Sequence, residues 1–129
     1  MNEETKFFIC KHCGNIVQMV KDSGAPLVCC GDPMDELKAN TTDASQEKHV
    51  PVIEVDGSKV TVTVGSVAHP MTDEHHIVWA HLQTNSGCQR KRFKIGAEPK
   101  LCFTLCKDDT PVAVYAYCNL HGLWKADIK

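Results

Sequence analysis

Residues 50–64 read VPVIEVDGSKVTVTV, and this stretch decides the fold. Its second half, KVTVTV, places valine at every other position, which is the period-2 pattern of a strand with one buried face. Asp56-Gly57 separates this half from the preceding apolar run and has the chemistry of a tight hairpin turn. The stretch therefore predicts two antiparallel strands, at 50–55 and 59–64.

Downstream of this hairpin, four more runs rich in β-branched and aromatic residues are separated by turn signals such as Asn85-Ser86-Gly87. Short strands that recur about every ten residues are typical of an antiparallel sandwich. The sequence contains no long helical pattern. We therefore expect a mainly β protein whose remaining strands cover 77–84, 90–95, 101–106 and 112–118.

Upstream of the hairpin, four cysteines follow the pattern Cys10-x2-Cys13-x15-Cys29-Cys30. A Cys-x2-Cys pair joined to a second pair by about 15 residues is a strong metal-site signal. The second pair has no spacer, so its two thiolates must distort the tetrahedral geometry that structural zinc sites prefer. Thiolates suit both iron and zinc, and the distortion favours iron.

Disulfides are the alternative for these cysteines, either as a strained bridge within Cys29-Cys30 or as two ordinary bridges. The sequence starts MNEETK, which is polar and lacks the apolar segment of a secretory signal peptide. We therefore expect a reducing compartment, in which cysteine spacings of this kind indicate metal binding.

The chain of 129 residues is long enough for one ordinary domain with a small module. About 40 residues bury too little apolar surface to fold without a staple, so residues 1–37 are expected to form a module nucleated by its metal. The polar stretch 38–46 is expected to be a linker, and residues 47–129 the β-domain.

No apolar run approaches the roughly 20 residues of a membrane helix, and the net charge is −2. We therefore expect no nucleic-acid partner and no membrane partner. The basic run 90–94 is expected on a solvated strand face, with docking of an acidic electron donor as the alternative. Cys88, Cys102 and Cys106 are expected to be free, buried thiols that pack as small apolar residues.

The expected β-domain contains six histidines and four cysteines. Its densest pair is Cys118-x2-His121 at the end of a predicted strand, where one loop offers a thiolate and an imidazole to a shared metal. His49 and His69 lie at other loop–strand junctions, where a rigid sheet positions functional side chains. The sequence therefore predicts a second metal site.

His75 and His76 are neighbours, and adjacent strand residues point to opposite faces, so one of the two is expected at this metal. His81 lies six residues beyond His75, roughly 20 Å along an extended strand, and is excluded. Four imidazoles and one thiolate exceed the four ligands of a structural zinc site. Imidazoles suit iron, zinc, copper and nickel, while the thiolate favours softer metals, and five ligands on a metal that prefers six leave an open position for chemistry.

Three segments resemble the superoxide reductases: EKHVPVI at 47–53, GSVAHPM at 65–71 and CNLHG at 118–122. CGNIV at 13–17 and LVCCG at 27–31 resemble desulforedoxin. In this order, the chain resembles the desulfoferrodoxins, the two-iron type of superoxide reductase, over nearly its whole length.

The resemblance implies a desulforedoxin-like module followed by an immunoglobulin-like antiparallel β-sandwich. It implies two iron ions per chain and the one-electron reduction of superoxide to hydrogen peroxide, with electrons from a small rubredoxin-like donor. It also implies a homodimer in the cytoplasm. The ligand sets that it implies are Cys10, Cys13, Cys29 and Cys30 for an Fe(Cys)4 centre, and His49, His69, His75, His121 and the axial Cys118 for an Fe(His)4(Cys) centre.

Lys48, next to a ligand, is expected to attract the superoxide anion. Glu47 resembles the family glutamate that binds the resting ferric iron once peroxide departs. One departure concerns His76, because the residue after the third ligand is usually aromatic in the family. The sequence thus offers a competing ligand, although the spacing from His69 matches His75.

Two other classes of protein compete with this interpretation. A cupredoxin-like electron carrier is also a β-sandwich with a Cys-x2-His-type loop, but blue-copper sites need an axial methionine, and none follows His121. A zinc-ribbon binding module with a passive β-domain is the second rival. A Cys118/His121 nucleophilic dyad is weaker, because nothing supplies an oxyanion site. Metal analysis separates these classes, as iron near two per chain, copper near one, or zinc alone.

Overall fold

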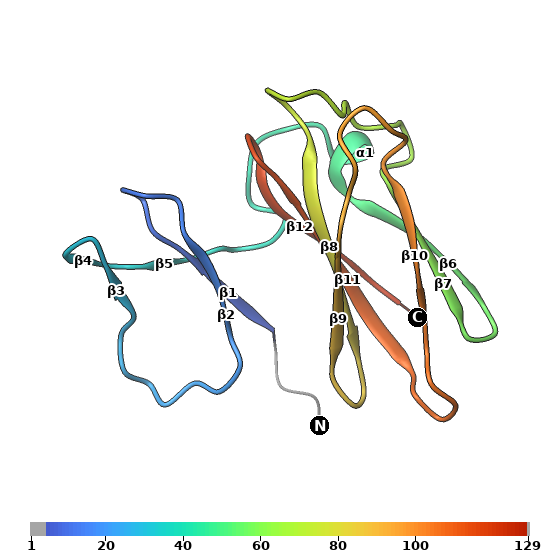
Figure 1. The fold of residues 1–129 in the computed structure, drawn as a ribbon, viewed down its shortest axis with the longest axis horizontal. Coiled ribbons are helices and arrows are strands. Elements are labelled where there is room, and N and C mark those ends of the chain that lie inside the picture. The colour runs from blue at the N-terminus through green and yellow to red at the C-terminus, as the bar shows by residue number, and fades with distance from the viewer. Residues whose placement is uncertain (1–4, 129) are drawn as a thin grey trace. The chain divides into compact units, whose positions relative to one another are not determined.

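The computed structural model describes residues 5–128, and the chain divides into two compact units, Met1–Lys38 and Ala39–Lys129 (Figure 1). Both units consist of antiparallel strands joined by turns. Among the described residues, no helix is long and apolar enough to cross a lipid bilayer.

The smaller unit contains two small antiparallel sheets. β1 (Lys6–Ile9) lies between β2 (Ile16–Met19) and β5 (Asp35–Glu36), and β3 (Val28–Cys29) pairs with β4 (Asp32–Pro33). Within the described part of this unit, the only buried hydrophobic residues are Phe7 and Cys10. So small a core leaves the unit dependent on a further staple.

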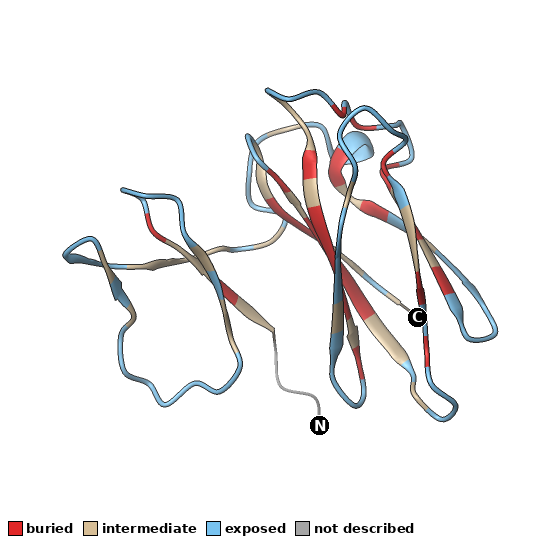
Figure 2. Cartoon of the chain, in the orientation of Figure 1, coloured by how far each residue is buried: buried red, intermediate tan, exposed pale blue. Residues whose placement is uncertain are grey.

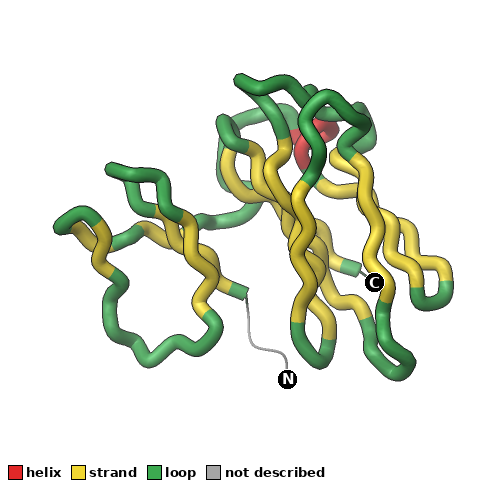
Figure 3. Tube along the Cα trace, in the orientation of Figure 1, coloured by secondary structure: helices red, strands yellow, loops and turns green. Residues whose placement is uncertain are grey.

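The larger unit is a sandwich of two antiparallel sheets, with strand orders β10-β7-β6 and β12-β11-β8-β9. Three strands facing four is the arrangement of an immunoglobulin-like fold, so the mainly β fold expected from the sequence is confirmed. A single turn of helix, α1 (Gln46–His49), precedes the first strand (Figure 3). The strands are β6 (Pro51–Asp56), β7 (Lys59–Val64), β8 (Ile77–Thr84), β9 (Cys88–Arg92), β10 (Lys100–Thr104), β11 (Pro111–Cys118) and β12 (Gly122–Asp127).

The alternating valines of β7 form one side of the hydrophobic core. Val60, Val62 and Val64 are fully buried and belong to the same core cluster as Leu82 of β8 and Val114 of β11. Figure 2 shows buried residues along these strands. Full burial of a branched side chain contributes about 1.5–3 kcal/mol, so the alternation supplies the stability of the sandwich.

Side chains of β9 form hydrogen bonds to the backbone of β10, in the other sheet of the sandwich. Lys91 Nζ donates to the carbonyl of Cys102 at 2.7 Å and lies 5.6 Å from the centroid of the Phe103 ring. Gln89 Nε2 donates to the carbonyl of Thr104 at 2.9 Å. The basic run therefore does more than face solvent, because its central lysine is bound to β10.

Several elements differ from the sequence prediction. The sequence pattern does not reveal α1, because four residues are too few to show a helical period. β9 covers 88–92 instead of 90–95, and β10 covers 100–104 instead of 101–106. The bounds of β6 and β11 differ from the predicted ones by one residue. β12 is not predicted either, because Leu123 and Trp124 are both buried and interrupt the alternation of a half-buried strand.

We expect Val62→Ala to lower the free energy of unfolding of the larger unit by about 2 kcal/mol, because it removes buried methyl groups and leaves a cavity. Val55→Ala is the matched control in the same hairpin, since Val55 is 47% exposed and Val62 is 0% exposed. Denaturant titration followed by the fluorescence of Trp79 and Trp124 measures both variants. Equal losses at both positions would contradict the assigned buried face of β7.

Candidate metal centres

Four imidazole rings of the larger unit surround a common centre. The centroids of neighbouring rings are 4.6 Å apart for His49–His69, 4.5 Å for His69–His75, 5.0 Å for His75–His121 and 4.9 Å for His49–His121. The diagonal from His49 to His75 is longer, at 6.4 Å. Four similar sides and a longer diagonal describe a square of nitrogen donors.

The four histidines come from different segments of the larger unit. His49 is the last residue of α1, His69 lies in the loop after β7, and His75 precedes β8. His121 lies in the turn between β11 and β12. The next residue, Gly122, has a left-handed φ of +80°, which side chains rarely adopt, so the turn that presents His121 requires glycine.

Backbone carbonyls fix two of the rings from behind. His49 Nδ1 donates to the carbonyl of Ser45 at 2.5 Å, and His69 Nδ1 donates to the carbonyl of Pro70 at 2.7 Å. A carbonyl only accepts, so in each ring the proton is on Nδ1 and Nε2 carries a free lone pair. This arrangement selects the tautomer and orientation that a metal-binding imidazole needs.

The free lone pairs face one another. His49 Nε2 lies 3.1 Å from His69 Nε2, and burial lowers the pKa of both rings, that of His69 to about 4. Neither neutral ring has a second proton to place between the two nitrogens. His75 Nε2 is buried and has no hydrogen-bond partner among residues 5–128. A cation at the centre satisfies all three nitrogens, so the site fits a metal ion.

Cys118 supplies a fifth donor at the end of β11. Its Sγ lies 3.4 Å from His69 Nε2 and 3.9 Å from His121 Nδ1, and it is fully buried. Burial raises the pKa of the thiol, while the backbone N–H groups of Leu120 and His121 lower it. A bound cation would favour the thiolate further. The five donor atoms all lie within 4.8 Å of one another.

The two other histidines of the larger unit lie outside this cluster. His76 Nδ1 donates to the carbonyl of Thr72 at 2.9 Å, so the ring belongs to the turn before β8. His81 is fully buried in β8, with its ring centroid 5.9 Å from that of Tyr115. The structure therefore brings His75, and not His76, to the other ligand candidates.

The four cysteines of the smaller unit form a second cluster, again with donor atoms within 4.8 Å of one another. All four are free thiols, which excludes the disulfide alternatives in this structure. Cys29 Sγ lies 3.6 Å from Cys13 Sγ and 3.9 Å from Cys30 Sγ. Cys30 has a left-handed φ of 52°, and this unusual conformation accompanies the convergence of two adjacent thiols.

The thiols of this cluster differ in how readily they ionise. The backbone N–H of Cys13 lowers the pKa of Cys10 to about 6. The neighbouring sulfur atoms of Cys13 and Cys10 raise the pKa of Cys30 to about 12. Four thiolates crowded together therefore need a cation, and soft thiolates select metals such as iron or zinc.

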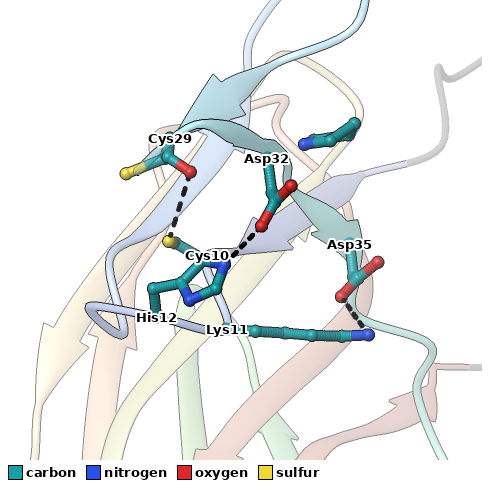
Figure 4. Close-up of a pocket in the computed structure, with 7 residues that line it drawn as sticks. Cys10, Lys11, His12, Cys29, Asp32 and Asp35 are labelled. Carbon is teal, nitrogen blue, oxygen red and sulfur yellow. Dashed lines mark hydrogen bonds and ion pairs between the residues drawn. The ribbon is translucent and has the colours of Figure 1, made fainter.

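A pocket of about 380 Å³ lies beside the cysteine cluster (Figure 4). Cys10 and Cys29 line it, and Cys10 Sγ lies 3.7 Å from the carbonyl of Cys29. The other polar residues of its wall form an ion pair between Lys11 and Asp35, at 3.1 Å, and a hydrogen bond between His12 Nε2 and Asp32, at 2.5 Å. These pairs link the segment between Cys10 and Cys13 to the segment that follows Cys30.

Comparison with known proteins assigns both units. The desulfoferrodoxin family profile matches residues 41–127, and the profile of the desulfoferrodoxin N-terminal domain matches residues 2–37. A desulfoferrodoxin homolog of Archaeoglobus fulgidus is 48% identical over 126 residues, which are 98% of this chain and 99% of that protein.

Two solved structures are similar to this one. The superoxide reductase of Treponema pallidum has a TM-score of 0.81 and 40% identity over 96% of this chain and 99% of its own. The one-iron superoxide reductase of Giardia intestinalis has a TM-score of 0.55 and 32% identity, over 64% of this chain and 98% of its own.

We expect Cys30→Ser to remove the metal of the smaller unit and to leave the metal of the larger unit in place. Cys106→Ser is the matched control, because Cys106 is also an exposed free cysteine but lies outside both clusters. Elemental analysis of the purified variants gives the metal content per chain. Unchanged metal content in Cys30→Ser would remove Cys30 from the ligand set.

Proposed function

The chain belongs to the desulfoferrodoxin family, and from this premise we propose that it is a superoxide reductase with two iron centres. The reaction transfers one electron to superoxide, which takes up two protons and leaves as hydrogen peroxide. The proposed ligands are the two convergent sets described above. Iron held by the four histidines and Cys118 would supply the electron.

The observation that carries this proposal is the square of imidazoles with a thiol on one side. Cys118 is buried, whereas His75 and His121 are partly exposed. The side of the square away from Cys118 therefore offers a place for a small anion to approach. A blue-copper carrier would instead need two histidines, one cysteine and a weak axial methionine.

Two residues of α1 place charge beside this square. Glu47 and Lys48 are both exposed and directly precede the ligand candidate His49. Burial is the main cause of the lowered pKa of His75, the neighbouring histidines come next, and the positive charge of Lys48 makes the smallest contribution.

The backbone of α1 is fixed by the loop that follows β7. The carbonyl of Glu47 accepts hydrogen bonds from Val67 N at 2.9 Å and Ser66 Oγ at 3.2 Å. A Cβ at Gly65 would lie 2.6 Å from the same carbonyl oxygen. Only glycine permits this close approach, which holds the charged turn against the segment that carries His69.

We assign Lys48 to substrate attraction and Glu47 to the resting state. A lysine at the entrance raises the local concentration of an anion such as superoxide and stabilises the charge that develops as the electron arrives. The exposed entrance gives solvent protons access to the product. Glu47 is proposed to offer its carboxylate to the oxidised iron that the site would hold between turnovers.

We further propose that a small rubredoxin-like protein donates the electrons and that the chain acts as a homodimer in the cytoplasm. The eight free cysteines support a reducing compartment. The iron of the smaller unit is proposed to be an accessory centre, since the reacting position belongs to the larger unit. Size-exclusion chromatography with light scattering measures the oligomeric state.

We expect Lys48→Ala to slow the bimolecular reaction with superoxide about tenfold at low ionic strength and to weaken its salt dependence, because the local cation is lost. Pulse radiolysis across a series of salt concentrations measures both effects. Lys59→Ala is the matched control, since Lys59 is also exposed but lies in the β6–β7 hairpin. A rate and salt dependence equal to those of the parent would exclude this role for Lys48.

We expect Cys118→Ser to abolish superoxide reduction and any thiolate-to-iron absorption band, because the thiolate that would bind the iron is lost. Cys13→Ser, in the other cluster, should disrupt the first centre and largely preserve the reaction of the reduced second centre. Pulse radiolysis and visible spectra of chemically reduced and oxidised samples separate the two variants. Loss of the reaction in Cys13→Ser would make the first centre an obligatory relay.

A further inference from the structure

His75 differs from the ligand candidates His49 and His69 in how its ring is supported. The rings of His49 and His69 each donate Nδ1–H to a backbone carbonyl. Among residues 5–128, no such carbonyl holds the His75 ring, and its buried Nε2 has no hydrogen-bond partner. Metal-binding imidazoles usually depend on an outer hydrogen bond for their orientation. The position of His75 must therefore be fixed through its backbone.

A tight turn fixes the local backbone of His75. Thr72 N donates to the carbonyl of His75 at 2.9 Å, and His75 N donates to Thr72 Oγ1 at 3.1 Å. His76 Nδ1 closes the turn on the carbonyl of Thr72. These contacts determine the shape of the turn, but they do not connect it to the remaining ligands.

Asn119 makes that connection. Its Oδ1 accepts from His76 N at 2.9 Å, and its Nδ2 donates to the carbonyl of Glu74 at 2.9 Å. Asn119 N also donates to the carbonyl of His76 at 3.2 Å. The Asn119 side chain, directly after Cys118 in the chain, thus hydrogen-bonds to the backbone of Glu74 and of His76, the two neighbours of His75.

These bonds occur where the regular β-ladder ends. β8 and β11 pair regularly from Gln83–Ala113 to Trp79–Tyr117, and the register then shifts so that Cys118 pairs with Ile77. Beyond this irregularity no further ladder pair joins the two segments. The amide of Asn119 supplies a donor and an acceptor in place of the missing pair.

We propose that Asn119 is the positioning residue for His75, and that it sets the location of this imidazole relative to the Cys118 sulfur. The proposal rests on the ligand set of the proposed function. Without the amide, the turn that carries His75 keeps its own hydrogen bonds but loses two of the bonds that tie it to β11. The square of donors would then open at the His75 corner, and the iron would be held less tightly.

The test uses the full chain with both irons bound, under anaerobic conditions and in excess ferrous chelator. Release of the second iron is followed by the loss of its thiolate-to-iron absorption after chemical oxidation of samples taken over time. We expect Asn119→Ala to release this iron at least about tenfold faster than the parent and to shift the absorption band. Asn119→Asp keeps the acceptor for His76 N and loses the donor to Glu74. Its rate of iron release should therefore lie between the rates of the parent and of Asn119→Ala.

Asn40→Ala is the matched control. Asn40 also makes a paired contact with a strand of the same unit, because its Nδ2 donates to the carbonyl of Lys125 at 3.1 Å and its Oδ1 accepts from Lys125 N at 2.9 Å. Its left-handed φ of 62° makes alanine additionally strained there, so this variant is the harsher test of stability. We expect its iron release to stay within about twofold of the parent rate.

Release from Asn119→Ala within about twofold of the parent, or equal acceleration by Asn40→Ala, would overturn the proposal. If Asn119→Ala does not fold, the unchanged release of iron from Asn119→Asp overturns it and accelerated release supports it. Superoxide turnover is not among these readouts. An iron-loaded parent that failed to reduce superoxide would therefore refute the proposed function while leaving the role of Asn119 to be decided by iron release.

Discussion

Repulsion among converging donor atoms is the constraint on which the larger unit depends. The Nε2 lone pairs of His49 and His69 face each other at 3.1 Å, which is unfavourable until a cation is present. His121 Nδ1 lies 3.0 Å from the first nitrogen, and the Cys118 sulfur lies 3.4 Å from the second. The fold must therefore hold the five donors together by contacts that face away from the centre. Carbonyls hold His49 and His69, while Trp124 stacks on the His49 ring at 4.8 Å and donates Nε1–H to the carbonyl of His121. Asn119 grips the backbone around His75, so every corner of the square has an outer support.

The sandwich meets this constraint by placing the site where its core ends. Cys118 belongs to the same buried cluster as the valines of β7, whereas Lys48 on α1 is exposed. The site therefore combines a buried sulfur atom, on Cys118, with a solvent-exposed ammonium group, on Lys48. In low-dielectric surroundings the sulfur interacts strongly with a bound metal. From the solvent-exposed side, an anion and solvent protons have access to the same centre.

The sequence predicts those parts of the molecule that depend on local periodicity. β7 and β8 have the predicted bounds, because alternation or a buried run is visible within each strand. β12 escapes prediction because neighbouring Leu123 and Trp124 are both buried, which reflects what lies on each side of the strand and not a local pattern. Strand alternation does not choose between His75 and His76, although the spacing from His69 in the related family matches His75. The choice depends on hydrogen bonds from Thr72 and Asn119, which are 3 and 43 residues away from their partners in the chain.

The two metal clusters place opposite demands on their surroundings. In the larger unit, a core that includes Val62 and Phe103 is buried independently of the ligands, so the sandwich has its own source of stability. The smaller unit buries only Phe7 and Cys10 among its described hydrophobic residues, and Cys10 is itself a ligand candidate. Its crowded thiols raise the pKa of Cys30 to about 12, so without a cation the Cys30 thiol remains protonated and cannot act as a thiolate ligand. Metal binding is therefore part of folding in the smaller unit, whereas in the larger unit it equips an existing fold with chemistry.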